Sequence, residues 1–465
     1  MPRDDGAGSE GAAAAGSTGF AGIGTNVVAG SLSWVTTAPN QPEPRTARDT
    51  PTGQDTPQAT SHGTSHVTWR TGTVTARGAT WTGAREVTLR LDTPLPARDL
   101  TTAPWEVRGL AYTALVGDPA VGDRLLVNVS ALARGLGTGG YALVVGPAGD
   151  ATALPADPHP GPGHLVKARY TPLQAMVLGV DEQESAHHDT LRDADDLAGL
   201  PVVVADLHSA LPAIVAGARH AADLAGRPHP RVAYVMTDGG ALPAAFSRTV
   251  ATLRDTGWLD ATVTVGQAFG GDLEAVTVHT GLLAARHVAD ADLVVLAQGP
   301  GNLGTGTRWG FSGVAAGEAV NAAATLGGRP VASLRVSGAD PRDRHRGVSH
   351  HSLTAYGRVA LAAADVPVPT PTGDLESLPA WGAELTRQVH DQASTLAPRH
   401  HLVDVPADTA LLDALRRSPA RLSTMGRSLD GDPASFVAAA VAGVHAEHLT
   451  HLAHEHPAHE EPTSR

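Results

Sequence analysis

The sequence is organised around residues 291–336, which read ADLVVLAQGPGNLGTGTRWGFSGVAAGEAVNAAATLGGRPVASLRV. Apolar runs at 292–298 and 330–335 flank a small-residue segment with helical spacing at 314–326. A strand, a crossover helix and a second strand make up the βαβ unit of a parallel sheet. The stretch therefore predicts a parallel α/β fold.

The loop after the first of these strands is rich in glycine, with Gly299, Gly301, Gly304, Gly306, Gly310 and Gly313. So many glycines cost backbone entropy, so we expect the backbone to approach something closely. The first three match G-x-G-x-x-G, but Pro300 fills the first x and the helix starts late, which is a poor dinucleotide fingerprint. Two interpretations stay open: an anion site of backbone N–H groups and Arg308, or a loop that lets helix and sheet pack closely.

Composition bounds the class of protein. The chain has 465 residues, more than one domain's worth, and 42% of them are hydrophobic. A net charge of -13 argues against a general nucleic-acid binder, and the lack of cysteine excludes disulfides and thiol chemistry. No apolar run is long enough to span a membrane, and the N-terminus lacks the apolar core of a signal peptide. We expect a cytoplasmic enzyme or binding protein.

Four regions follow from patterning. Residues 1–66, rich in Gly, Ala, Ser, Thr and Pro, predict a disordered arm or a start codon assigned too early. Residues 67–157 alternate apolar and polar positions and predict a small β-barrel-like domain of five to seven strands. Residues 164–366 alternate strands and helices, which predicts a doubly wound, mostly parallel, Rossmann-like sheet. Residues 367–465 read as a Pro-rich connector, helices and a His-rich tail.

Polar loops follow the predicted parallel strands. In an open parallel sheet, ligands bind beyond the carboxyl ends of the strands. We therefore expect five loops to meet in one crevice: residues 205–212, 237–243, 266–274, 298–311 and 337–352.

These loops hold the candidate acid–base groups. Asp206 and His208 stand two apart after a strand, and His350 begins a helical run. They could serve as general acid and base or as metal ligands, joined by His187, His188 and Asp189, by His279 or by His351. The structural alternatives are a helix cap for Asp206 and simple exposure for a histidine.

Two further aspartates and one charged run each allow a functional and a structural interpretation. Asp238 and Asp272, each beside a Gly-Gly pair, fit a general base or a hydroxyl binder as well as an ordinary helix cap. Residues 340–346 interleave arginines with acids, which fits a lid that clamps an anion or a solvated loop. The C-terminal histidines fit adventitious metal binding.

Several long motifs carry a family resemblance, among them VVVADLHSALPA, YVMTDGGALP, VLAQGPGNLGTGTRWGFSGV and RHRGVSHHSLTAYGR. The segment from about Val67 to Val366 resembles an actinobacterial family, domain of unknown function 3866. The family has no assigned activity, so the resemblance implies no catalytic residue. It implies a high-GC bacterial cytoplasmic protein.

Two functions remain open. One is an enzyme acting on a small anionic metabolite, with the glycine loop and Arg308 holding the anion, His208 or His350 as acid or base, and Asp206 or Asp238 orienting it. The other is a non-catalytic ligand sensor or assembly subunit, because no complete catalytic signature such as G-x-S-x-G, a P-loop or H-E-x-x-H is present. Cofactor, metal and substrate stay undetermined, and segment 314–326 fits a homo-oligomer contact as well as sheet packing.

Overall fold

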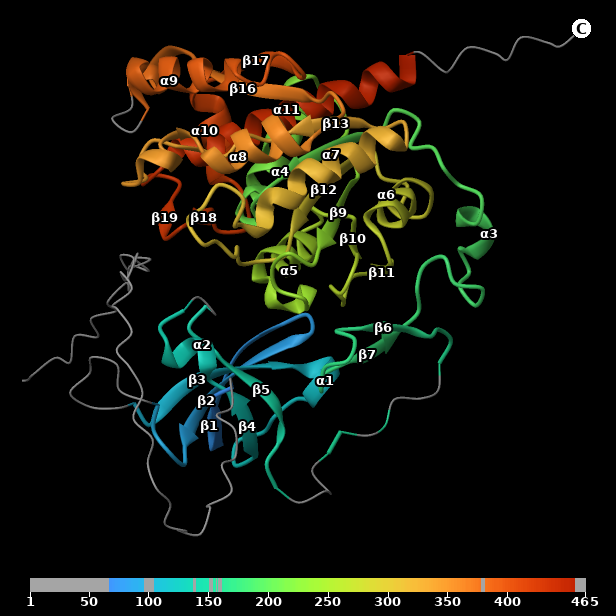
Figure 1. Cartoon of the computed structure of the whole chain (residues 1–465), viewed down its shortest axis with the longest axis vertical. Helices are drawn as coiled ribbons and strands as arrows, with labels where there is room; N and C mark the ends of the chain where they lie inside the picture. The colour runs from blue at the N-terminus through green and yellow to red at the C-terminus, as the bar shows by residue number, and fades with distance from the viewer. Residues whose placement is uncertain are drawn as a thin grey trace, which may run out of the picture. The chain divides into compact units, whose positions relative to one another are not determined.

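The computed structural model describes residues 67–95, 104–136, 139–149, 154–155, 157, 161–377 and 381–455. The predicted disordered arm at 1–66 and the end of the His-rich tail lie outside these residues. The described chain contains a β-barrel and an α/β sheet (Figure 1).

The barrel is closed and has five strands in the order β1-β2-β3-β5-β4. They are β1 (Trp69–Trp81), β2 (Ala84–Leu91), β3 (Glu106–Tyr112), β4 (Arg124–Asn128) and β5 (Ala142–Pro147), with short helices α1 (Thr113–Val116) and α2 (Ser130–Ala133). Alternate residues such as Val87, Leu89 and Leu91 point into the interior. Pairing of β1 with β4 completes the closure, which confirms the predicted barrel-like domain.

The α/β sheet has eight parallel strands in the order β11-β10-β9-β12-β8-β13-β16-β17. They are β8 (Pro201–Ala205), β9 (Val232–Thr237), β10 (Ala261–Thr264), β11 (Leu273–Glu274), β12 (Leu293–Gln298), β13 (Arg329–Ala332), β16 (Asp365–Pro371) and β17 (His401–Ala407). The chain enters at β8, runs outward through β9 to β11, returns to β12 and leaves through β13 to β17. The loops after β8 and β12 thus depart in opposite directions, the arrangement that opens a crevice at the strand ends.

Helices cover both faces of this sheet. Right-handed crossovers place α4 (Leu211–Leu224), which follows β8, and α7 (Ala315–Thr325), which follows β12, on opposite faces. The C-terminal helix α11 (Pro433–Glu455) and α10 (Thr409–Arg416) pack beside α4, and α6 (Val278–His287) packs beside α7. The doubly wound prediction is therefore confirmed (Figure 1).

Shorter elements complete the description. The remaining helices are α3 (His188–Leu191), α5 (Arg248–Asp255), α8 (His350–Thr354), α9 (Gly382–Ser394) and the single turns η2 (His208–Ala210), η3 (Ala244–Phe246), η4 (Ser312–Val314), η5 (Asp343–His345), η6 (Ala355–Val359) and η7 (Gly373–Ser377). Three two-stranded antiparallel pairs are β6 (Leu165–Lys167) with β7 (Ala175–Val177), β14 (Val336–Ser337) with β15 (Gly347–Val348), and β18 (Ser423–Thr424) with β19 (Arg427–Ser428).

The start of the region 164–366, expected to belong to the parallel sheet, lies elsewhere. Residues 165–167 and 175–177 form the β6–β7 hairpin, which is antiparallel and separate. Lys167, the only lysine of the chain, is fully buried there. Its ammonium donates to the carbonyls of Ala268 (2.9 Å) and Ala275 (2.8 Å) and lies 3.4 Å from Glu274. This lysine joins the hairpin to the edge of the sheet.

The sheet also continues past residue 366, where the sequence suggested a Pro-rich connector. Pro367, Pro369 and Pro371 lie in β16. Thr372 N–H donates to Ala407 of β17. Successive N–H groups of a strand point to opposite sides, so the backbone nitrogens of the three prolines face β13. There β16 pairs only at Asp365, opposite Val331, so the missing proline N–H groups break no ladder.

Helices α4 and α11 cross at two glycines. A Cβ added to Gly217 would lie 2.0 Å from the Ala440 oxygen, and one added to Gly443 would lie 1.9 Å from the Ile214 oxygen. Such distances are far below van der Waals contact, so the backbones meet directly at both points. The crossing fixes the beginning of α11 against the sheet edge.

We therefore expect Gly443→Val to lower the free energy of unfolding by about 3 kcal/mol or more, because an overpacked crossing must separate. Gly431→Ala is the matched control, since its Cβ would have its nearest neighbour at 3.5 Å. Urea unfolding of both variants measures the difference. Equal midpoints would contradict the close crossing.

Candidate functional site

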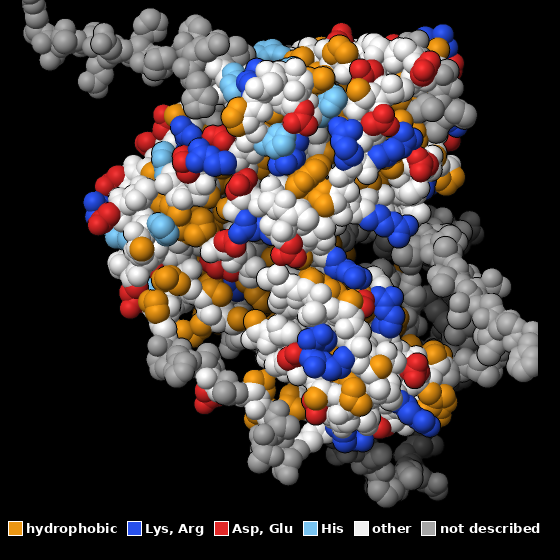
Figure 2. All heavy atoms as spheres, turned by 180° about the vertical axis from the view of Figure 1, so that it is seen from behind, with side chains coloured by type: hydrophobic (Ala, Val, Ile, Leu, Met, Phe, Trp, Pro, Cys, Tyr) orange, Lys and Arg blue, Asp and Glu red, His pale blue; other side chains and the backbone are white. Residues whose placement is uncertain are grey.

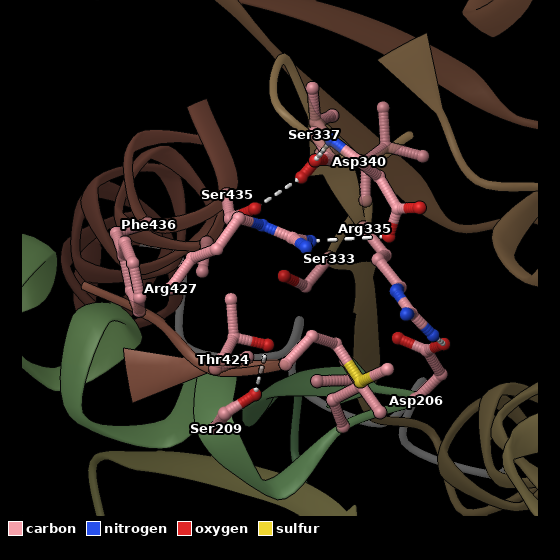
Figure 3. Close-up of a pocket in the computed structure, with 17 residues that line it drawn as sticks. Asp206, Ser209, Ser333, Arg335, Ser337, Asp340, Thr424, Arg427, Ser435 and Phe436 are labelled. Atoms are coloured by element: carbon pink, nitrogen blue, oxygen red, sulfur yellow. Dashed lines mark hydrogen bonds and ion pairs between the residues drawn. The ribbon is translucent and has the colours of Figure 1, made fainter. Parts of the chain in front are cut away.

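A small pocket with both polar and apolar lining residues lies at the carboxyl ends of β8 and β13 (Figure 3). Its cavity holds about 30 Å³, room for a few water-sized groups. Four segments supply its walls: residues 205–210, 333–340, 424–427 and 435–439. The strand ends thus meet the β18–β19 hairpin and the start of α11, which come more than 200 residues after β8 in the chain.

Arg335 occupies the inner side of this pocket. Its side chain is 11% exposed, and Nη1 lies 3.0 Å from His351 Nδ1 and 3.7 Å from Asp206 Oδ2. Its backbone N–H donates to Ser352 Oγ at 2.9 Å. A guanidinium only donates, so neutral His351 accepts at Nδ1 and carries its proton on Nε2. Burial lowers the pKa of Arg335, and the Asp206 carboxylate opposes that shift.

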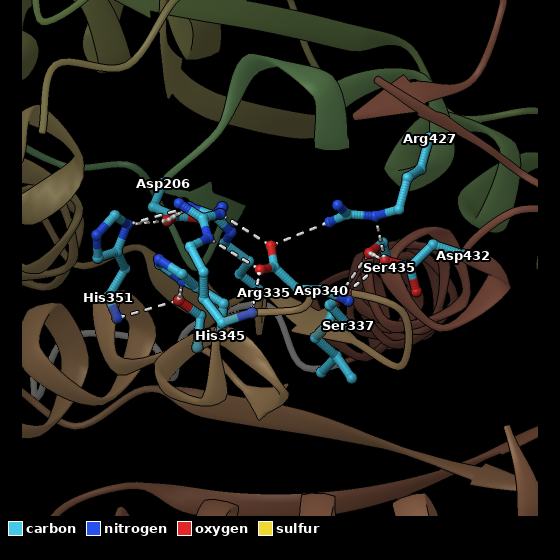
Figure 4. Close-up of polar contacts among 12 residues, drawn as sticks. Asp206, Arg335, Ser337, Asp340, His345, His351, Arg427, Asp432 and Ser435 are labelled. Atoms are coloured by element: carbon cyan, nitrogen blue, oxygen red, sulfur yellow. Dashed lines mark hydrogen bonds and ion pairs between the residues drawn. The ribbon is translucent and has the colours of Figure 1, made fainter. Parts of the chain in front are cut away.

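Arg427 lies opposite, held by two buried carboxylates (Figure 4). Its Nε donates to Asp432 at 3.1 Å and its Nη2 donates to Asp340 at 3.2 Å. Asp432 also accepts hydrogen bonds from the hydroxyls of Ser337 and Ser435. Because these partners come from the β14 loop and the start of α11, the guanidinium is positioned before any ligand arrives.

Asp340 stays ionised in this network. Burial raises its pKa, but hydrogen bonds from Arg342 and the charges of Arg342 and Arg427 outweigh burial and hold the pKa well below its usual range. Arg342 grips the carboxylate through Nε (2.9 Å) and Nη2 (2.8 Å). The run 340–346, expected to be a lid or a solvated loop, therefore contributes an ion pair between buried Asp340 and half-buried Arg342, while residues 341, 343, 344 and 346 are exposed.

Three histidines gather on the other side of Arg335. One nitrogen each from His345, His350 and His351 lies within 4.8 Å of the others, the one such group of three His, Asp or Glu side chains among the described residues. Phe311 stacks on His351 with ring centroids 3.8 Å apart. Ser349 Oγ contacts His345 Nδ1 at 2.8 Å and caps α8. The cluster combines imidazole nitrogens with an apolar cover.

Two buried polar atoms beside the cluster lack a hydrogen-bond partner among the described residues. They are His350 Nε2 and Asp206 Oδ2. Asp206 is only 3% exposed, and its backbone oxygen accepts from Gln298 Nε2 at 2.8 Å. A buried polar atom without a hydrogen bond lowers the stability of the folded state by about 1–3 kcal/mol. Such atoms are rare in folded proteins, so both indicate a ligand site or a local strain.

His345 and His350 are uncharged at neutral pH. Burial, the neighbouring Arg335 and Arg342, and His351 together lower the pKa of His345 far below its usual value. Burial and His351 lower the pKa of His350 to about 4. Neutral imidazole is the form that binds metals and accepts protons.

His208, expected to be an acid–base group, has a structural place instead. Its Nδ1 lies 2.9 Å from Tyr234 Oη and its Nε2 lies 2.7 Å from Ser247 Oγ. Tyr234 donates to the Gln298 oxygen, and Ser247 Oγ accepts from Val250 N–H as the cap of α5. Nδ1 therefore donates and Nε2 accepts, which leaves neither nitrogen for a substrate.

This burial makes His208 a source of acid sensitivity. Desolvation lowers its pKa from 6.5 to about 4, so the unfolded chain binds the extra proton between these values. Stability is then full above pH 6.5 and falls by up to about 3 kcal/mol as the pH drops to 4.

We expect His208→Gln to reduce the slope of unfolding free energy against pH in this window by about 1.4 kcal/mol per pH unit. Exposed His279→Gln should leave the slope unchanged. Urea unfolding at a series of pH values provides the measurement, and parallel slopes for all three proteins would rule out a buried neutral His208.

The single crevice expected from five loops forms only in part. Asp206 and His350 lie in the same region, but Asp238 is exposed and accepts from Gln267 N–H at 2.9 Å. Asp272 lies at the start of β11 and accepts from Thr262 N–H at 2.7 Å, toward the opposite end of the strands. The reason is that residues 273–274, expected in the loop 266–274, form a strand, so Asp272 lies at its beginning.

The start of the glycine-rich loop packs against the backbone of residues 240–241, so it leaves no open space for an anion there. A Cβ on Gly240 would lie 2.1 Å from the Gly299 oxygen, and one on Gly299 would lie 2.4 Å from the Ala241 oxygen. This contact favours the packing interpretation for Gly299. The remaining expected anion ligands Gly301, Gly304, Gly306 and Arg308 are exposed.

Other expected ligands lie apart from the histidine cluster. His188 contacts the Asp181 oxygen at 2.8 Å, Asp189 pairs with Arg192, and His279 is exposed on α6. His187, beside α3, also lies outside the group of three.

Sequence reasoning missed Arg335, Arg427, Thr424 and Asp432. Arg335 was visible as a charge at the end of an apolar run, a useful signal. The others lie in a C-terminal segment whose pattern indicated only helices.

Two further properties of the described residues are their surface charge and the composition of their helices. Acidic and basic side chains are interspersed over the face in Figure 2. No helix in the described part of the chain has the length and apolar character needed to cross a membrane.

Comparison with known proteins gives one match. No curated protein and no solved structure matches the chain. The family model described as protein of unknown function (DUF3866) matches residues 108–443, a range that begins later than the expected start near Val67, extends beyond the expected end near Val366 and includes Arg427 and Asp432. The chain therefore belongs to the DUF3866 family.

Proposed function

We propose that this protein is an enzyme acting on a small metabolite whose carboxylate or phosphate binds between Arg335 and Arg427. The observation that carries the proposal is the pair of guanidinium groups lining one small pocket at the strand ends. Guanidinium is the preferred partner of planar oxyanions because its N–H groups form parallel hydrogen bonds. The ligand's anionic group would enter, since the cavity of about 30 Å³ admits little more.

The pocket supplies neutral donors as well. Ser209 Oγ donates to Thr424 Oγ1 at 3.0 Å, and both residues line the cavity with Ser333. Arg335 makes one side-chain hydrogen bond among the described residues, to His351, so its other N–H groups remain for a ligand. Asp206 and the histidine cluster lie beside this position and provide the reactive side of the site.

The second candidate is ligand sensing without turnover. It is favoured by the pocket walls, which join strand ends to the β18–β19 hairpin and α11. An anion bound between Arg335 and Arg427 would link these segments and stabilise them together.

A thermal-shift screen with small carboxylates, inorganic phosphate and sugar phosphates tests the anion site. We expect a stabilising ligand whose affinity falls about 10–100-fold in Arg335→Lys, because the charge remains while the fork of donors is lost. Arg427→Gln should lose a similar amount.

Arg308→Gln is the matched control and tests the rival site on the glycine loop. If Arg308→Gln abolishes ligand stabilisation while Arg335→Lys does not, the anion binds on the loop and the proposal is wrong. Mass spectrometry of the recovered ligand separates the two candidates: a product indicates an enzyme, and unchanged ligand indicates sensing.

A further inference from the structure

We propose that His345, His350, His351 and Asp206 form a binding site for a divalent transition-metal ion of the Zn²⁺ class. The site lies beside the anion pocket and does not depend on whether that pocket binds a metabolite. Three imidazoles and one carboxylate are a donor set that suits zinc, cobalt and iron better than magnesium or calcium, which prefer oxygen ligands throughout.

The geometry brings the three imidazoles to one place, and Asp206 lies beside His351, outside the group whose ligand atoms all lie within 4.8 Å of one another. The ring centroids of His350 and His351 lie 4.4 Å apart, and those of His345 and His350 lie 4.9 Å apart. Asp206 Oδ2 lies 3.7 Å from His351 Nδ1. An ion that bonds at about 2.0–2.2 Å needs a contraction of the cluster, which side-chain rotation can provide.

Two unsatisfied atoms point to a ligand independently of the clustering. Asp206 is 97% buried, as its 3% exposure implies, yet its Oδ2 has no hydrogen-bond partner among the described residues. His350 Nε2 is buried and equally without a partner. A cation bound at the histidine cluster would give His350 Nε2 a partner and place a positive charge beside Asp206 Oδ2, whereas a purely structural aromatic cluster on Phe311 would leave both atoms unsatisfied.

The local chain positions the ligands. Ser349 caps α8 by accepting from His351 N–H, which places His350 and His351 in the first turn. The same hydroxyl contacts His345 Nδ1 at 2.8 Å, so Nε2 of that ring is the free ligand atom. A hydrogen bond to the second ring nitrogen is the usual means of orienting a metal-binding histidine.

Arg335 competes with a metal ion for His351 Nδ1. Its Nη1 lies 3.0 Å from His351 Nδ1 and 3.7 Å from Asp206 Oδ2, so a metal ion must displace it from His351. Removing this positive charge should tighten metal binding, an effect opposite to that of removing a ligand. The full chain also carries His454, His456 and His459 near its end, which can bind metal adventitiously.

The test therefore uses the full chain with those three tail histidines replaced by alanine, stripped with a chelator and then titrated with Zn²⁺ alone. We expect one equivalent to bind and to raise the melting temperature, and Co²⁺ in its place to give visible absorption bands. His350→Ala and Asp206→Asn should weaken Zn²⁺ about 100-fold. Exposed His279→Ala, the matched control, should leave the affinity unchanged.

Arg335→Met should bind Zn²⁺ about tenfold more tightly, which keeps the test decisive if a ligand variant fails to fold by circular dichroism. The proposal is overturned if the tail-substituted protein binds no stoichiometric Zn²⁺, if His350→Ala binds as tightly as its parent, or if Arg335→Met shows no gain. Loss of all binding on tail substitution identifies an adventitious ion only.

Discussion

The buried carboxylate of Asp206 at the end of β8 is the constraint on which the site depends. Strand β8 lies in the middle of the sheet, and Asp206 is 3% exposed directly after it. A buried carboxylate needs a compensating charge, and the structure supplies Arg335 at 3.7 Å. The guanidinium of Arg335 also donates to His351. The buried carboxylate of Asp206 therefore determines where both Arg335 and His351 lie.

Charge balance extends from this pair into the C-terminal segment. Arg335, Arg342 and Arg427 face Asp206, Asp340 and Asp432 across the strand ends (Figure 4). Three cations and three anions leave the region near neutrality, so a bound metal ion and a bound oxyanion would offset one another. The direct backbone contact of α4 with α11 holds Asp432, which immediately precedes α11, at this location.

The same physics explains why His208 was a misleading candidate. A histidine two residues after Asp206 has the sequence position of an acid–base group, but the sequence does not show what surrounds its ring. Tyr234 and Ser247 come from β9 and the cap of α5, and they use both nitrogens. Conversely, Arg427 looked unremarkable because its partners Asp340 and Asp432 are 87 and 5 residues away in the chain.

The sequence by itself determined a small barrel-like β domain, the parallel α/β sheet with helices on both faces, and the rule that polar residues follow the strands. These features rest on hydrophobic periodicity and turn residues, which act over a few neighbouring positions. The order of the strands, the inclusion of the proline-rich β16 and the position of Asp272 at the opposite strand end depended on long-range pairing. Only the tertiary structure decided which polar side chains share a pocket, because burial and hydrogen bonding join residues such as Asp206, Arg335 and His351 that are far apart in the chain.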